Sequence, residues 1–206
     1  KRLFEAEDSF FWHRGRQGLI ERLLHKFTQA LAGSSRKKLK ILDVGCGTGS
    51  NFPLLSRFGQ VVGCDFAEKA LSFARRKFPQ AKWMKADARK LPFASERFDL
   101  ITALDVLEHI KEEEEALREW RRVLKEGGLL LLTVPAYPWL WSEHDEFLGH
   151  FRRYYLSSLR AALERANFRV IFISYWLFSL FPLMVFQRLM LKLKRRGRSA
   201  YPSFPS

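Results

Sequence analysis

Cysteine is scarce in this sequence, and its scarcity limits what the chain can be. Only Cys46 and Cys64 occur among 206 residues, too few for a disulfide framework. Both fall in or beside expected strand ends. We therefore expect two small, reduced packing residues of a cytosolic protein, with a disulfide or redox pair as the alternative. Internal repeats and low-complexity tracts are also absent.

Uncharged apolar runs of the ~20 residues that a spanning helix needs are missing as well. Glu7 and Asp8 interrupt the start of the chain, so no secretory signal is expected and the predicted location is cytoplasmic. Residues 175–186 are apolar and uncharged, but they fall short of the ~20 residues that a spanning helix needs, and Pro182 interrupts them. A spanning segment is not expected.

Acidic residues are few relative to basic ones, with 22 against 36 and a formal net charge of +14. An excess of basic residues is typical of proteins that bind nucleic acid, anionic lipid or acidic substrates. Part of the excess follows the apolar run, at Lys192, Lys194, Arg195, Arg196 and Arg198. An apolar run followed by basic residues indicates that residues 176–206 bind peripherally to an anionic membrane surface rather than to RNA. The alternative is a helix that packs on the domain or in a homodimer interface.

What is present fits one domain over residues 1–175, because 47% apolar residues supply a sizeable core. Residues 8–32 have helical periodicity, with Leu19, Leu23, Leu24 and Phe27 on one side. Helices are also predicted from about residue 50, over 68–78, over 111–125 (with Leu117, Trp120, Val123 and Leu124 on the inward side and Gly127 and Gly128 ending it) and over 156–166. They alternate with apolar strands, of which 129–134 should be central and 168–174 the sixth. The pattern predicts an α/β fold with a doubly wound, mostly parallel sheet and helices on both faces.

The most informative stretch is residues 41–51, where an expected strand ends in Gly45, Gly47 and Gly49. Glycine allows a sharp turn and the close approach of a ligand. The dinucleotide pattern G-x-G-x-x-G fits poorly, because its third glycine would fall on Ser50. The stretch therefore predicts a nucleotide-like ligand at the carboxyl end of the first strand.

Acidic residues follow the next strands in order. Residues 61–65 end in Asp65, a carboxylate suited to a ribose diol. Residues 84–88 carry Asp87, and the strand at 98–103 leads into Asp105. These motifs, in this order, resemble those of the class I S-adenosylmethionine-dependent methyltransferases, in the branch with small-molecule and quinone-type enzymes. The resemblance covers roughly residues 39–175 and implies the Rossmann-like methyltransferase fold, with residues 8–32 as a lid helix.

The resemblance also implies S-adenosylmethionine as the cofactor and a set of residues that bind it. These are Arg16, Asp43, Gly45, Gly47, Thr48, Gly49, Asp65, Phe66, Asp87, Ala88, Leu104 and Asp105. Asp43 would lie beneath the amino group, Asp65 would bind the ribose and Phe66 would flank adenine. Asp87 would accept from the adenine amino group. Arg14 and Arg16 are candidates for the cofactor carboxylate, with solvated helix arginines as the alternative.

Two histidines are the catalytic candidates. His109 follows the fourth strand, where acceptor and methyl group should meet, and a neutral imidazole there can take a proton. The alternative is a helix cap. His150 opens residues 150–154, which resemble a substrate-loop element of this branch. Its histidine and arginines would contact a polar headgroup, or else shape the loop.

A metal is not predicted, although ligand types gather in this region. Some related methyltransferases bind metal through a Glu-His pair at this place. The ligand types present are Asp105, Glu108, His109, His144 and His150. Their spacing across two loops does not establish a site.

The predicted function is methyl transfer to a hydrophobic small molecule or lipid-linked acceptor, with oxygen favoured over carbon or nitrogen. Nucleic acid is disfavoured, because residues 105–108 lack the Asn/Asp-Pro-Pro-aromatic motif and no cysteine follows the fourth strand. The alternatives are an NAD(P)-dependent oxidoreductase and a non-catalytic, cofactor-binding membrane adaptor.

Overall fold

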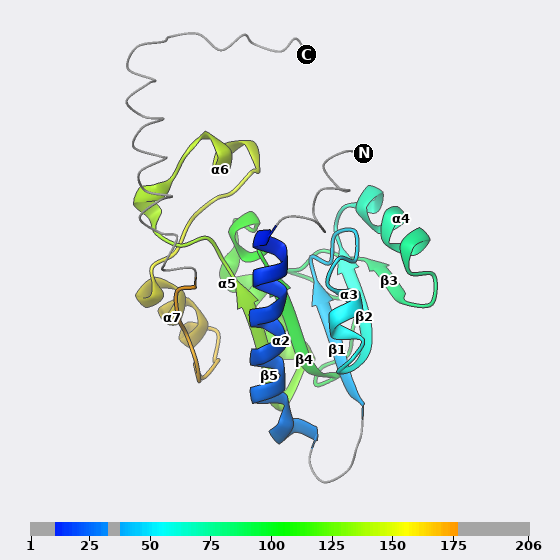
Figure 1. The fold of residues 1–206 in the computed structure, drawn as a ribbon. Helices are drawn as coiled ribbons and strands as arrows, with labels where there is room; N and C mark the ends of the chain where they lie inside the picture. The colour runs from blue at the N-terminus through cyan, green and yellow to red at the C-terminus, as the bar shows by residue number, and fades with distance from the viewer. Residues whose placement is uncertain (1–10, 33–37, 177–206) are drawn as a thin grey trace, which may run out of the picture.

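The computed structural model describes residues 11–32 and 38–176, which form a parallel five-stranded sheet in the order β3-β2-β1-β4-β5 (Figure 1). The strands are β1 (Leu39–Val44), β2 (Gly59–Asp65), β3 (Lys82–Lys85), β4 (Phe98–Leu104) and β5 (Leu124–Thr133). Every neighbouring pair is parallel. The predicted fold class is therefore confirmed. The predicted apolar and basic extension, from residue 177 on, lies outside the described residues.

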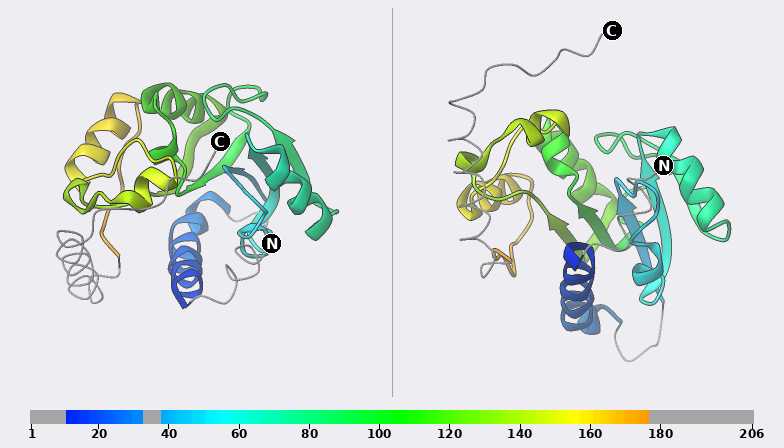
Figure 2. Two further views of the ribbon diagram at one scale, coloured as in Figure 1. Left: turned by 90° about the horizontal axis from the view of Figure 1, so that it is seen from above. Right: turned by 45° about the horizontal axis from the view of Figure 1, so that its top comes forward.

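Helices cover both faces of this sheet (Figure 2). The helices are α2 (Phe11–Ala32), α3 (Phe52–Leu55), α4 (Glu68–Lys77), α5 (Glu113–Val123), α6 (Glu143–Phe147) and α7 (Leu156–Arg165), with short 3-10 turns η1 (Leu107–His109) and η2 (Pro138–Leu140). One apolar core lies between the sheet and α2 and α3, and the other between the sheet and α5 and α7. This is the doubly wound arrangement that the alternating pattern predicts.

Helix α2 buries Leu24, as predicted, but the rest of its buried stripe is shifted by one position from the predicted one. Arg16, Ile20, Leu24 and Thr28 are buried at a spacing of four residues, while Leu19, Leu23 and Phe27 are half-buried. The inward face is thus turned by about one position. This rotation brings Arg16 under the sheet's carboxyl end.

Helix α5 confirms its predicted inward stripe but not its predicted end. Leu117, Trp120 and Val123 are buried. The helix ends at Val123, before the glycines at 127 and 128, because Leu124 already pairs with Phe98 of β4. An irregular register between Phe98 and Leu100 accommodates the extra residues before the regular ladder starts at Leu129.

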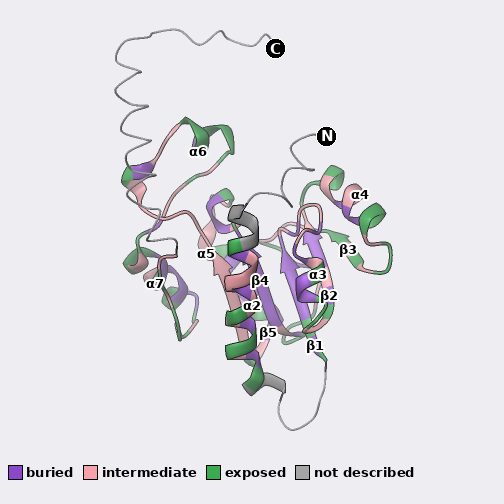
Figure 3. Cartoon of the chain, viewed as in Figure 1, coloured by how far each residue is buried: buried purple, intermediate pink, exposed green. Residues whose placement is uncertain are grey.

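Strand β5 was predicted to be central and buried on both faces, and this is wrong. It forms an edge of the sheet, and residues 129–134 are only half-buried, as the pink arrow in Figure 3 shows. No described strand pairs with its outer side.

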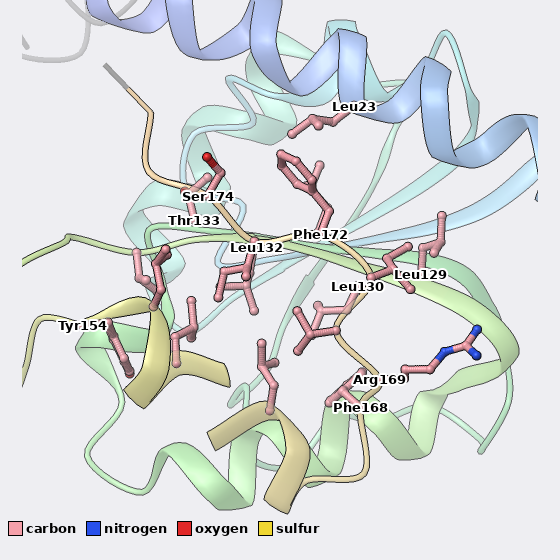
Figure 4. A pocket seen from close by; sticks show the side chains of 18 of the residues that line it. Leu23, Leu129, Leu130, Leu132, Thr133, Tyr154, Phe168, Arg169, Phe172 and Ser174 are labelled. Atoms are coloured by element: carbon pink, nitrogen blue, oxygen red, sulfur yellow. The ribbon is translucent and has the colours of Figure 1, made fainter. Parts of the chain in front are cut away.

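The predicted sixth strand at residues 168–174 is also wrong. This segment carries no strand, because its backbone pairs with none of the described strands, although the outer side of β5 is open. It runs beside β5 and leaves an apolar hollow of about 510 Å³ against α2 and α7 (Figure 4). Leu23, Leu130, Leu132 and Phe172 lie on its walls.

Cys46 and Cys64 are free and buried, which agrees with their predicted packing role. Within residues 11–32 and 38–176, none of the helices combines the length and the apolar character that crossing a bilayer requires.

Candidate cofactor and acceptor site

The carboxyl ends of β1, β2 and β4 bring the predicted site residues to one edge of the sheet. Figure 1 shows that the strand arrowheads point to the end of the molecule where α6 and the start of α2 lie. The parallel register places Asp43 beside Gly63 and Thr102, one residue before β1 ends. In open parallel sheets this edge is where ligands bind.

The glycine loop after β1 is held by Asp65 at the end of β2. The Gly47 amide donates to Asp65 Oδ2 at 2.8 Å, and the Ala67 amide donates to Oδ1 at 2.8 Å. The Cys46 amide donates to the Cys64 carbonyl at 3.0 Å. Asp65 therefore fixes the loop and keeps its remaining lone pairs for a ligand. Its predicted ribose contact stays a prediction.

The three loop glycines have left-handed φ values, but their surroundings differ. A Cβ on Gly45 (φ 63°) would lie 2.4 Å from Val106, and one on Gly49 (φ 80°) would lie 2.7 Å from the Trp83 ring. A Cβ on Gly47 (φ 54°) would meet no atom within 4 Å. Gly45 and Gly49 thus allow close packing within the protein, whereas Gly47 opens onto free space. Thr48 lies half-buried between the last two.

Asp43 lies buried beneath this loop. It accepts a hydrogen bond from the Thr102 hydroxyl at 2.6 Å. Burial raises the pKa of Asp43 to about 7, although the hydrogen bonds from Thr102 and Asn51 oppose the shift. This carboxyl group therefore gains or loses its proton near neutral pH, depending on the charge of its neighbours.

Asp105, after β4, is paired with Arg16 from α2. Its φ is 58°, and its backbone and side chain both bond Thr133 of β5, with the Thr133 hydroxyl donating to Oδ1 at 2.8 Å. The Arg16 Nε is buried and has no hydrogen-bond partner among the described residues. Arg16 thus neutralises the charge of Asp105, and its Nε–H group remains available as a hydrogen-bond donor to a ligand. Leu104, which precedes this pair, is buried in the core beside α2.

The predicted adenine-binding residues lie at the β2 and β3 side. Phe66 is 73% exposed, so its ring is accessible to a ligand. Asp87 is already held by Arg89, whose Nη2 donates at 2.7 Å. Ala88 accepts a hydrogen bond from Trp120 through its carbonyl. The adenine contacts remain predictions, and a contact to Asp87 has to share this carboxylate with Arg89.

Glu108, His109 and His150 form a cluster next to Asp105. One ligand atom of each lies within 4.8 Å of the others, and the two imidazole rings meet edge to face at 4.6 Å. The Phe151 amide donates to the Glu108 carbonyl at 2.7 Å, which brings His150 to η1. Burial and the charge of His150 lower the pKa of His109 below its usual value. Burial and the charge of Asp105 raise the pKa of Glu108 to about 8.

Asp145 supports this cluster and is a residue that the sequence analysis missed. It is fully buried and bonds the His150 Nδ1 at 3.1 Å and the Arg153 Nε at 2.7 Å. Burial alone would raise the pKa of Asp145, but hydrogen bonds from Arg153 and Ser142 outweigh it and lower the pKa to about 2. The Ser-x-x-Asp spacing of residues 142–145 is a capping-box signal that could have revealed it.

The arginines of the 150–154 loop shape the loop, which was one of the two alternatives. Arg153 bonds Asp145 and the Ala136 carbonyl, and Arg152 pairs with Glu113 at 2.8 Å. Tyr154 donates to the same Glu113 at 2.6 Å.

The site fits S-adenosylmethionine in three respects. Gly47 leaves open space where the cofactor backbone would approach, and Asp65 presents a carboxylate beside it. The unpartnered Arg16 Nε is a buried donor suited to the carboxylate of the methionine part.

Comparison with known proteins agrees with this geometry. Residues 42–132 match the protein family described as a methyltransferase domain. The 2-phytyl-1,4-naphthoquinone methyltransferase of Thermosynechococcus vestitus is 36% identical over 122 residues, which cover 56% of this chain and 52% of that protein. The ubiquinone/menaquinone biosynthesis C-methyltransferase of Campylobacter jejuni is 29% identical over 132 residues, or 60% and 54% of the two chains.

A solved structure of a putative methyltransferase from Bacillus halodurans superposes with a TM-score of 0.60 at 28% identity, over 71% of this chain and 68% of that one. The chain spans about half the length of the curated relatives that it matches. These matches favour a methyltransferase over the dinucleotide-dependent oxidoreductase. With the sheet order and the glycine loop, they support a class I S-adenosylmethionine-dependent methyltransferase, with S-adenosylmethionine as the cofactor.

Proposed function

We propose that this protein transfers the methyl group of S-adenosylmethionine to an oxygen of a hydrophobic small molecule or lipid-linked acceptor. The observation that carries the proposal is a set of exposed hydrophobic side chains on the chain segment that holds His150. Large hydrophobic side chains are exposed on the segment that leads to and from His150, namely Trp139, Phe147, Leu148, Phe151 and Tyr155. Exposed apolar side chains gathered in one loop system are typical of a binding surface.

The printed names of two relatives support a hydrophobic acceptor, because one acts on a phytyl naphthoquinone and another belongs to quinone biosynthesis. The second is named a C-methyltransferase, so carbon is the alternative methylated atom. An oxygen acceptor and an acidic carbon both have to lose a proton. Both reactions therefore need groups in the site that assist the loss of this proton.

The chain's own residues meet this demand in distinct ways. When bound, the cofactor supplies an activated methyl carbon, whose bond to sulfur breaks with its electrons going to sulfur as the acceptor bonds to carbon. Asp65 and the glycine loop would hold the nucleoside part. Arg16 would bind the carboxylate, and the pair of His109 and His150 would contact the acceptor and assist the loss of its proton. Positioning of this kind contributes up to about 7–11 kcal/mol to lowering a barrier.

The test is to incubate the purified protein with methyl-labelled cofactor and a lipid extract. We expect label in an organic-soluble product whose methyl chemical shifts are those of a methyl ether. His150→Ala should lose most of the turnover, whereas His144→Ala, an exposed histidine of the same loop, should keep it. Methyl chemical shifts typical of a carbon-bound methyl group would show that carbon, and not oxygen, is the methylated atom. Label confined to water-soluble products would contradict the hydrophobic acceptor.

A further inference from the structure

Three side chains near the end of β4 have the composition of a metal site. Glu108 and His109 lie on η1, and His150 follows α6. A carboxylate oxygen and one nitrogen from each ring lie within 4.8 Å of one another. First-row divalent ions bind such ligands at about 2.0–2.2 Å. Small rotations of the side chains, easiest for the exposed His109, would close the remaining distance.

Glu108 has a buried oxygen that lacks a partner. The residue is 1% exposed, and its Oε2 accepts no hydrogen bond from the described residues. An unsatisfied buried acceptor is destabilising, and more so when the group is charged. A cation held beside the two imidazoles would remove this cost.

Asp145 fixes His150 in the orientation that a ligand needs. The carboxylate Oδ1 of Asp145 lies 3.1 Å from the His150 Nδ1 and is also bound by Arg153. Because a carboxylate only accepts, Nδ1 carries the hydrogen, and in the neutral form of the ring Nε2 has the free lone pair. Metal-binding histidines commonly donate their other nitrogen to a carboxylate in this way.

We propose that Glu108, His109 and His150 bind one divalent transition-metal ion, with Asp145 as the positioning residue behind His150. Two histidines and one carboxylate leave coordination positions open. If the proposed function holds, an oxygen of the acceptor occupies one of them, and the ion promotes the loss of the acceptor's proton to water. The imidazoles then act through the ion as ligands. Ion binding itself does not depend on the acceptor.

The test uses the full chain, freed of metal by chelation and of any histidine tag. Zn²⁺ is titrated calorimetrically, and Co²⁺ is followed by its visible absorption. We expect one ion per chain. His109→Ala, whose side chain is exposed, and Glu108→Gln should each weaken binding by at least about tenfold, and Asp145→Asn by about 10- to 100-fold. His144→Ala is the matched control and should bind as the wild type does.

Two results would overturn the proposal. One is a wild-type protein that shows no binding of either ion. The other is binding that persists unchanged in His109→Ala and His150→Ala, each checked for folding by thermal melting. Both are measured without an acceptor. A protein that binds no ion but still methylates a lipid would thus refute the metal site and leave the proposed function standing.

Discussion

Gly47 gives the sharpest separation between folding and cofactor binding. Gly47→Ala forces an alanine into a left-handed conformation, at φ 54°, but its methyl group meets no protein atom within 4 Å. The strain of such a residue is about 1–2 kcal/mol. For a domain of this size we therefore expect the melting temperature to fall by about 2–8 °C.

Cofactor binding should suffer separately, because the methyl group occupies the space into which the ligand fits. Overfilling a packed contact typically costs about 1–3 kcal/mol. This corresponds to about 5- to 150-fold in the dissociation constant. Calorimetric titration with S-adenosylhomocysteine measures the loss directly.

Gly127 is the matched control for this substitution. Its φ is 71°, a Cβ there also meets no atom within 4 Å, and it lies near the start of β5, away from the strand tips. Gly127→Ala should lose a similar amount of thermal stability and keep wild-type affinity. If Gly47→Ala bound S-adenosylhomocysteine as tightly as Gly127→Ala, the open space at Gly47 would not be the cofactor site.

Three further predictions follow from the same contacts. Asp65→Ala should weaken S-adenosylmethionine binding by about tenfold or more, since it loses both the ligand contact and the tie to the Gly47 amide; unchanged affinity in calorimetry would argue against the ribose assignment. Asp43 keeps its proton up to about pH 7 when folded but loses it near pH 3.8 when unfolded, so the free energy of unfolding should fall as pH rises through this window, by about 1.4 kcal/mol per pH unit. Urea unfolding of Asp43→Asn should lack this component, and an identical pH profile would refute the shift. Gly63→Ala places a methyl group 2.4 Å from Trp83 and should destabilise the protein by about 1–3 kcal/mol, whereas Gly18→Ala, within α2 and with no atom within 4 Å, should not.

The sequence predicted those parts of the fold that local pattern determines. The helical stripe of α5 and the acids at the ends of β1 and β2 are set by spacing along the chain. Parallel strands end at one edge, so Asp43 and Asp65 had to lie near each other. The proline at 53 likewise marks the start of α3, whereas Asn51 occupies the N-cap position without a capping hydrogen bond from its side chain.

The position of β5 could not be predicted in this way. An apolar run at residues 129–134 looks the same whether a strand is central or at an edge, because burial depends on what lies beside it. Residues 168–174 have strand composition but find no backbone partner among the described strands. Pairing between strands is a property of the whole sheet, and periodicity does not report it.

The candidate site was likewise predictable only where a local sequence pattern marks its residues. His109 and His150 were singled out by type, yet their contact depends on the 40 residues between them, which include α5 and β5, returning the chain so that the Phe151 amide reaches the Glu108 carbonyl. The pairing of Arg16 with Asp105 joins residues 89 positions apart and has no local signal. Asp145, by contrast, was accessible through its capping box with Ser142.

The most direct test of the account is a crystal structure of the chain with S-adenosylhomocysteine bound. We predict the ribose hydroxyls on the Asp65 carboxylate, the nucleoside across the ends of β1 and β2, and the sulfur facing Asp105 and His109. A ligand found instead in the apolar hollow beside β5, or with its sulfur turned away from the histidines, would contradict it.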